Sequence, residues 1–152
     1  MENGTQQASS IIESFPWEHL VTRDRIMELH ARAILEHNKE PLETGPAHAD
    51  CVDAKLGNAW QAESYVADED AKSGICFAGF LLVYLAVGHC FPDGNKRIGW
   101  AAAMAVLAAL GLTVKATDDE CTDFVERIAS GQIREGLDAV HWIAVRLDAP
   151  DL

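Results

Sequence analysis

The chain of 152 residues is 49% hydrophobic and 24% charged, and its formal net charge is −12. These values predict one globular domain with its own core, because a chain of this length buries enough apolar surface without covalent staples. The negative charge repels a nucleic-acid backbone, so we expect no direct nucleic-acid partner.

The first predicted element follows an amino-terminal extension, residues 1–20, and is a helix that Thr22 caps. Apolar residues recur behind the cap at intervals of three and four, namely Ile26, Leu29, Ala33 and Ile34. Proline and glycine predict a loop over residues 38–48, and a second helix is predicted over 51–65. Residues 21–152 form the predicted domain.

The middle of the chain is predicted to hold two central helices. One opens at Asp68 and Glu69 and runs toward Gly88, and its uniformly apolar interior places it inside a bundle. The other runs over residues 95–110 and ends at Gly111. The loop between them therefore lies at one end of the core.

These central helices contain two uncharged runs, residues 74–88 and 98–114. Each run is shorter than the roughly 20 residues of a membrane-spanning helix. Alanine is abundant in the second run, which suits close helix packing in a protein core. We therefore predict no membrane partner.

The carboxy-terminal part is predicted to add two helices. Thr117 and Glu120 have capping-box spacing, so one helix starts there and stops near Gly131. The last helix is predicted over residues 134–147, and residues 113–115 are too short to anchor a sheet. The sequence thus predicts an all-α fold, a helical bundle around two central helices.

The cysteines and the first residues bear on the cellular compartment. The four cysteines are scattered and form no CxxC pair: Cys51, Cys76, Cys90 and Cys121. We interpret them as reduced thiols, with Cys90 as a small packing residue. Residues 1–10 are polar and lack the basic segment of a secretory signal, so we expect a cytoplasmic protein.

The loop from His89 to Arg97 concentrates polar chemistry between the two uncharged runs. The helix that begins at Asn95 starts with backbone N–H groups that lack intrahelical partners and carry partial positive charge. Gly94 allows an anion to approach closely, and Lys96 and Arg97 add two charges at the helix end that disfavours cations. A phosphate bound there explains this placement; two solvated side chains are the simpler alternative.

Two further residues of the loop are candidates for chemistry. Asp93 is a candidate Mg²⁺ ligand, because Mg²⁺ takes one or two carboxylates plus phosphate oxygens and waters; helix capping is an equal alternative. His89 is a candidate general base, since imidazoles titrate near neutral pH, although histidines at helix ends more often interact with the helix dipole. Phe91 is interpreted as an anchor to the core, and His30 as a core or pocket-wall residue.

The run HCFPDGNKR at residues 89–97 resembles the signature of the Fic/Doc family, HxFx(D/N)(G/A)NxR. The helix that holds His30 and the apolar helix that ends at Gly111 extend the resemblance over roughly residues 20 to 147. Lys96 is similar to the Doc ("death on curing") branch, whereas Gly94 is the Fic-like choice. Trp100 stands where most Fic proteins carry a second arginine.

The resemblance implies an all-helical Fic-type fold with the active loop between two central helices, and ATP as co-substrate. It implies His89 as the general base and Asp93 as the Mg²⁺ ligand. The anion-binding nest that it implies comprises Gly94, Asn95, Lys96 and Arg97.

The resemblance also implies a Doc-like toxin of a toxin–antitoxin pair. Such a toxin transfers the γ-phosphate of ATP to a Ser/Thr hydroxyl of a target protein such as elongation factor Tu and halts translation. A Phd-type antitoxin would inhibit it in trans, in agreement with the missing (S/T)xxxE(G/N) inhibitory motif, because Gly131 precedes Glu135 where Ser or Thr is required. The alternatives are a Fic-type AMP transferase and a non-catalytic nucleotide-binding helical module.

Overall fold

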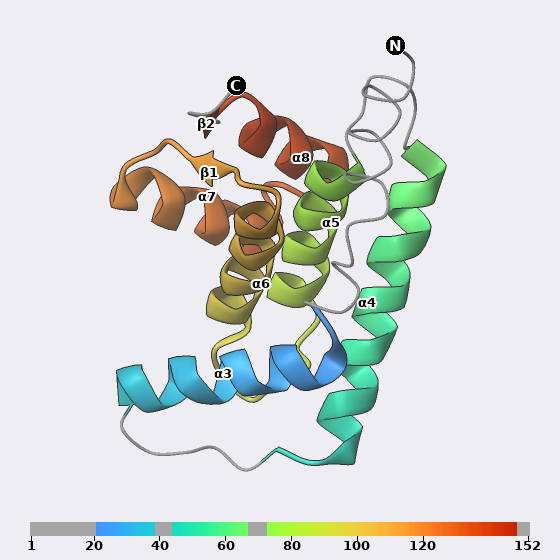
Figure 1. Cartoon of the computed structure of the whole chain (residues 1–152). Helices are drawn as coiled ribbons and strands as arrows, with labels where there is room; N and C mark the ends of the chain where they lie inside the picture. The colour runs from blue at the N-terminus through green and yellow to red at the C-terminus, as the bar shows by residue number, and fades with distance from the viewer. Residues whose placement is uncertain (1–20, 39–43, 67–72, 149–152) are drawn as a thin grey trace.

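The computed structural model describes residues 21–38, 44–66 and 73–148, which form six helices and two short strands. The helices are α3 (Arg23–Asn38), α4 (Pro46–Val66), α5 (Ser73–Val87), α6 (Asn95–Ala109), α7 (Asp118–Ala129) and α8 (Gly136–Ala144), and the strands are β1 (Thr113–Val114) and β2 (Leu147–Asp148). This architecture confirms the all-α prediction (Figure 1). The predicted extension 1–20 and the predicted helix start at Asp68 and Glu69 lie outside the described residues.

Helix α5 is the centre of the bundle and contacts α4, α6, α7 and α8 (Figure 1). Four of its large side chains are fully buried, namely Phe77, Leu81, Leu82 and Leu85. The uniformly apolar sequence is therefore explained by neighbours on every side of the helix. Within the described ranges, no helix combines the length and the hydropathy needed to span a bilayer.

Helices α5 and α6 approach each other closely because small residues line their seam. A Cβ atom added at Gly99 would lie 3.0 Å from the carbonyl oxygen of Leu82 and 3.2 Å from the backbone nitrogen of Ala86. Ala102 and Ala103 on α6 are fully buried. The chain between the two helices, residues 88–94, therefore reverses direction over a short distance at one end of the core.

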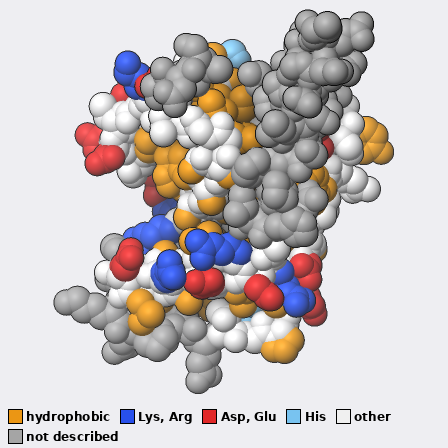
Figure 2. Space-filling model, viewed as in Figure 1, with side chains coloured by type: hydrophobic (Ala, Val, Ile, Leu, Met, Phe, Trp, Pro, Cys, Tyr) orange, Lys and Arg blue, Asp and Glu red, His pale blue; other side chains and the backbone are white. Residues whose placement is uncertain are grey.

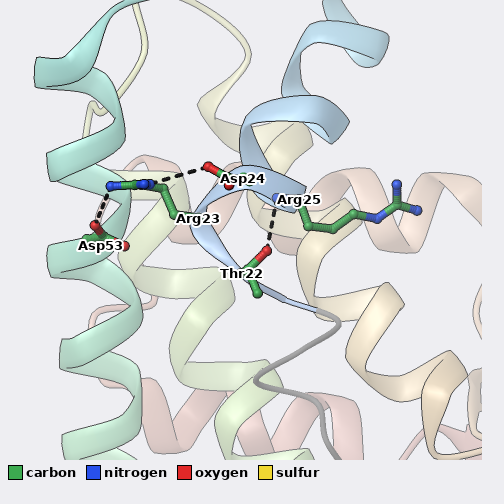
Figure 3. Close-up of polar contacts among 5 residues, drawn as sticks. All are labelled: Thr22, Arg23, Asp24, Arg25 and Asp53. Carbon is green, nitrogen blue, oxygen red and sulfur yellow. Dashed lines mark hydrogen bonds and ion pairs between the residues drawn. The ribbon is translucent and has the colours of Figure 1, made fainter.

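Helix α3 crosses this end of the bundle and is tied to α4 at its first turn. Thr22 Oγ1 accepts a hydrogen bond from the backbone N–H of Arg25 at 3.2 Å, which confirms the predicted cap (Figure 3). The Arg23 guanidinium reaches Asp53 on α4 at 3.2 Å and Asp24 at 3.4 Å (Figure 3). The ion pair with Asp53 joins the first turn of α3 to α4, and this helps to hold α3 in place beside the loop 88–94.

The predicted helix boundaries are right for α3, α6, α7 and the end of α5, and wrong for the start of α4 and for α8. The Thr117 capping box is present, and Gly111 and Gly131 adopt positive φ after their helices. The predicted loop over 38–48 is wrong at its end, because α4 begins at Pro46. Proline is well tolerated at the first helical position, where its missing N–H costs nothing.

The carboxy-terminal end differs from the prediction in two ways. Helix α8 covers Gly136–Ala144 rather than 134–147, because the chain leaves the helix and enters β2. The expectation that 113–115 anchors no sheet is also wrong. Thr113 lies opposite Asp148 and Val114 opposite Leu147 in an antiparallel ribbon of two residues per strand.

Candidate active site

A cleft of about 430 Å³ opens where the loop 88–94 meets the start of α6. It is lined by Ala86, His89, Pro92, Asp93, Gly94, Asn95, Lys96, Arg97 and Ala129. The volume is in the range of small-molecule sites. Figure 2 shows Lys and Arg side chains gathered in a hollow above α3, beside the start of α6. All six predicted site residues thus share one cleft.

The start of α6 is a helix end without a side-chain cap. Gly94 is the N-cap residue, with φ 82° and ψ 12°, and as a glycine it has no side chain to cap the first N–H groups as Thr117 does at α7. A left-handed conformation of this kind favours glycine. The uncapped N–H groups and their partial positive charge suit an anion.

Asp93 lies one residue before this N-cap. Its Oδ1 accepts a hydrogen bond from the N–H of Gly94 at 2.8 Å. Gly94 and not Asp93 is the N-cap residue of α6, so Asp93 bonds the amide that directly precedes the first helical residue. Asp93 itself is exposed at the edge of the cleft.

Asn95 uses its side chain to close the loop. Its Nδ2 donates to the carbonyl oxygen of Phe91 at 2.8 Å, and its Oδ1 accepts from the Phe91 N–H at 3.1 Å. This reciprocal pair occupies both ends of the amide. Asn95 can therefore face an anion through its backbone N–H, while its side chain shapes the loop.

His89 is exposed on the cleft and has φ 52°, which makes it the one non-glycine residue with positive φ in the described part of the chain. Residues with a Cβ atom rarely adopt this conformation, and it persists only where the surroundings impose it. The backbone of His89 thus has an uncommon conformation, and its imidazole lies at the rim of the candidate site.

A disulfide between Cys51 on α4 and Cys90 holds the residue next to His89, with Cα atoms 5.4 Å apart. The interpretation of the cysteines as reduced thiols is therefore wrong for this pair, and Cys90 is more than a packing residue. The sequence separation of 39 hides the pairing, because only the packing of α4 against α5 brings the two cysteines together. Cys76 and Cys121 are free.

Phe91 anchors the loop as predicted. Its ring is buried and stacks on the ring of His30 from α3, with centroids 3.7 Å apart and planes 11° apart. His48 of α4 lies nearly parallel to Phe91 at 6.3 Å. The core interpretation of His30 is confirmed, since only 2% of it is exposed.

His30 also bonds the loop backbone, which sequence reasoning missed. Its Nε2 lies 2.7 Å from the carbonyl oxygen of Asp93. Burial lowers the pKa of His30, against the opposing effect of this bond. A polar ring on an apolar helix face was the only sign in the sequence.

The two cations of the site differ in their surroundings. The Lys96 ammonium lies 2.5 Å from a carboxylate oxygen of Glu126 on α7, whereas Arg97 forms no ion pair among the described residues. Glu126 was not predicted, because nothing in the sequence links positions 30 residues apart. Trp100 lies outside the cleft lining and meets Phe124 of α7 edge-on at 6.4 Å.

The described residues contain no group of three or more His, Cys, Asp or Glu side chains that could hold a metal ion alone. Asp93 is the one carboxylate in the cleft lining, beside the uncapped helix start. This arrangement fits Mg²⁺ that arrives with phosphate, because phosphate oxygens and waters complete its usual coordination.

The sequence matches the family model described as the Fic/DOC family over residues 20–107. No curated protein matches the chain. The matched segment contains α3 to α5, the complete loop and all but the end of α6, and thus every residue of the cleft lining except Ala129.

Proposed function

Because the chain belongs to the Fic/DOC family, we propose that it is a protein kinase that transfers the γ-phosphate of ATP to a serine or threonine hydroxyl of a target protein. Members of this family are transferases that act on proteins, and they typically use ATP. The observation that carries the proposal is a helix start capped by a glycine, with two adjacent cations and an exposed histidine that line one cleft.

The proposed reaction uses each of these groups once. The target hydroxyl oxygen attacks the γ-phosphorus, the bond from that phosphorus to the β–γ bridging oxygen breaks, and ADP leaves. The imidazole of His89 takes the hydroxyl proton. The N–H groups of α6, with Lys96 and Arg97, hold the phosphate charge in place.

Asp93 would hold Mg²⁺ together with the phosphates of the nucleotide, and the ion would offset phosphate charge. The side chain lies at the edge of the cleft and lines it beside Gly94. Its backbone is fixed through the carbonyl bond to His30. The backbone that carries the proposed ligand is thus fixed before nucleotide binds.

Lys96 favours γ-phosphate transfer over AMP transfer. An ammonium group at this position fills space and adds a charge that suits a terminal phosphate. Trp100, which stands in place of a second arginine, is packed toward Phe124 and supplies no cation to the cleft. The alternative function, AMP transfer, is favoured by Gly94, the residue typical of Fic-type loops. A non-catalytic nucleotide-binding module remains the third alternative.

ATP labelled at the α- or the γ-phosphate separates these functions. The purified chain is incubated with each labelled ATP and with cell extract, and labelled protein is counted. γ-label on protein supports the kinase, and α-label supports the AMP transferase. Protein that carries no label in either reaction supports the non-catalytic module. His89→Asn serves as the control, because asparagine tolerates positive φ and removes the imidazole.

We further propose a biological setting, a Doc-like toxin that a Phd-type antitoxin inhibits in trans and that modifies a translation factor such as elongation factor Tu. The support is the resemblance of the loop to the Doc branch through Lys96. Expression of the chain should arrest growth and protein synthesis, and His89→Asn should not. Growth arrest that persists with His89→Asn would contradict a toxin that works by this chemistry.

A further inference from the structure

His30 is a polar side chain that the proposed reaction does not use. It is 2% exposed, it comes from α3, and it is not part of the cleft lining. Burial of an imidazole costs free energy unless its nitrogen atoms are bonded. A residue kept polar at such a position calls for an explanation from its contacts.

The closest ring contact and the hydrogen bond of His30 both fall on the loop that forms the candidate site. The His30 ring stacks on Phe91 at 3.7 Å, and its Nε2 lies 2.7 Å from the carbonyl oxygen of Asp93. A carbonyl oxygen only accepts hydrogen bonds, so Nε2 carries the proton and donates. Burial lowers the pKa of His30, in keeping with a neutral ring of this tautomer.

The same ring fills the space behind Gly94. A Cβ atom added at Gly94 would lie 3.2 Å from Nε2 of His30 and 3.0 Å from Cδ1 of Ile34. Gly94 holds φ 82° and begins the helix whose N–H groups face the cleft. His30 thus lies against the turn that starts α6.

We propose that His30 is a positioning residue for nucleotide binding. It fixes the carbonyl of Asp93 and the left-handed turn at Gly94, so that the first N–H groups of α6 point into the cleft before nucleotide arrives. The link to catalysis rests on the proposed function, but the effect on the loop is independent of which group is transferred. Preorganised donors bind an anion without the cost of ordering them first.

Two substitutions at His30 separate its hydrogen bond from its packing. His30→Phe keeps an aromatic ring against Phe91 and removes the donor to Asp93. His30→Gln keeps a donor at a similar reach and loses the ring. Ile34→Val is the matched control, because Ile34 is a buried neighbour of Gly94 on the same helix and loses only a methylene group.

Three measurements on the full chain follow the loop without relying on turnover. They are the affinity for ATP, the melting temperature, and amide hydrogen exchange at Gly94 and Ile98. The Gly94 amide bonds Asp93 Oδ1, and the Ile98 amide bonds the Gly94 carbonyl. Both amides therefore report on the start of α6.

We expect His30→Phe to weaken ATP binding about tenfold, the value of one net hydrogen bond, and to speed exchange at both amides. His30→Gln should restore most of the affinity, and Ile34→Val should change stability but not affinity. In turnover, KM for ATP should rise in His30→Phe while kcat stays within about twofold, as for an interaction equal in ground and transition states.

Two outcomes would overturn the proposal: equal affinity and exchange in His30→Phe and His30→Gln, or the same losses in Ile34→Val. A wild-type chain that transfers no group to protein would refute the proposed function alone, because affinity and exchange still decide the role of His30. Full turnover in a His30→Phe variant with unchanged KM would refute the positioning role and leave the function intact.

Discussion

The ammonium group of Lys96 lies 2.5 Å from the carboxylate of Glu126, so the cation assigned to a phosphate already has an anionic partner on α7. Both side chains are about half exposed, 48% for Lys96 and 56% for Glu126. Water and salt screen such a pair, and its strength is modest. In the proposed function, a nucleotide phosphate would compete with Glu126 for Lys96, and mutation of Glu126 would shift this balance.

Glu126→Gln is expected to tighten ATP binding up to about fivefold, the range of an exposed ion pair. Titration calorimetry with ATP measures the change. Asp123→Asn is the matched control, because it removes one negative charge from the exposed side of the same helix. An equal gain in both variants would show that net charge, not the pair with Lys96, sets the affinity.

His89→Asn is expected to lower the transfer rate by about two to four orders of magnitude, the usual contribution of a general base. ATP affinity should stay near the wild-type value, because the N–H groups of α6 and its cations remain. Rate and affinity are measured on the same preparation. His141→Asn, an exposed histidine on α8, controls for loss of any imidazole. A variant His89→Asn that keeps the full rate would exclude the base role.

Reduction of the disulfide between Cys51 and Cys90 is expected to lower the free energy of unfolding by about 2–4 kcal/mol, the usual range for cross-links of this kind. Denaturation with and without a dithiol reductant measures the loss. A thiol count in denaturant should rise from two to four on reduction. Cys51→Ser should unfold alike in both conditions. Four thiols in the untreated protein would show that the bond is absent.

Cys121 is expected to react slowly with alkylating agents near neutral pH. Burial raises the pKa of this thiol, and the carboxylates of Asp118 and Glu120 raise it further. A raised pKa keeps the group protonated, so the reactive thiolate forms only as the pH rises beyond the usual range for cysteine. Mass spectrometry of the alkylated peptide against pH follows the reaction. Asp118→Asn should move the profile to lower pH, and Asp119→Asn should leave it in place.

The sequence predicted the elements whose ends carry their own chemical signals. Thr117 and Glu120 cap α7, and glycines 111 and 131 end helices, so these boundaries were readable from single residues. Pro46 was misread as a loop residue because proline marks both the interruption and the first turn of a helix. The strands β1 and β2 were missed because each has only two residues, too few to show the alternating pattern of a strand.

The members of the candidate site were readable because they are adjacent in the chain. What could not be read were the contacts that reach the loop from other elements. Cys51 of α4 and His30 of α3 contact the loop, and Glu126 of α7 contacts Lys96 at the start of α6; only the packed bundle brings these distant positions together. Local chemistry thus identified the site, while its electrostatic balance and its rigidity depend on tertiary structure.

The glycine contact between α6 and the backbone of α5 has a consequence for reading mutational data. Gly99 allows the backbone of α6 to pack directly against the backbone of α5. The distance between these helices sets the distance between the two ends of the loop. A bulkier residue at position 99 would spread the helices and open the mouth of the cleft. A screen for ligand-binding defects should therefore recover substitutions at this contact between α5 and α6, although Gly99 is not part of the cleft lining.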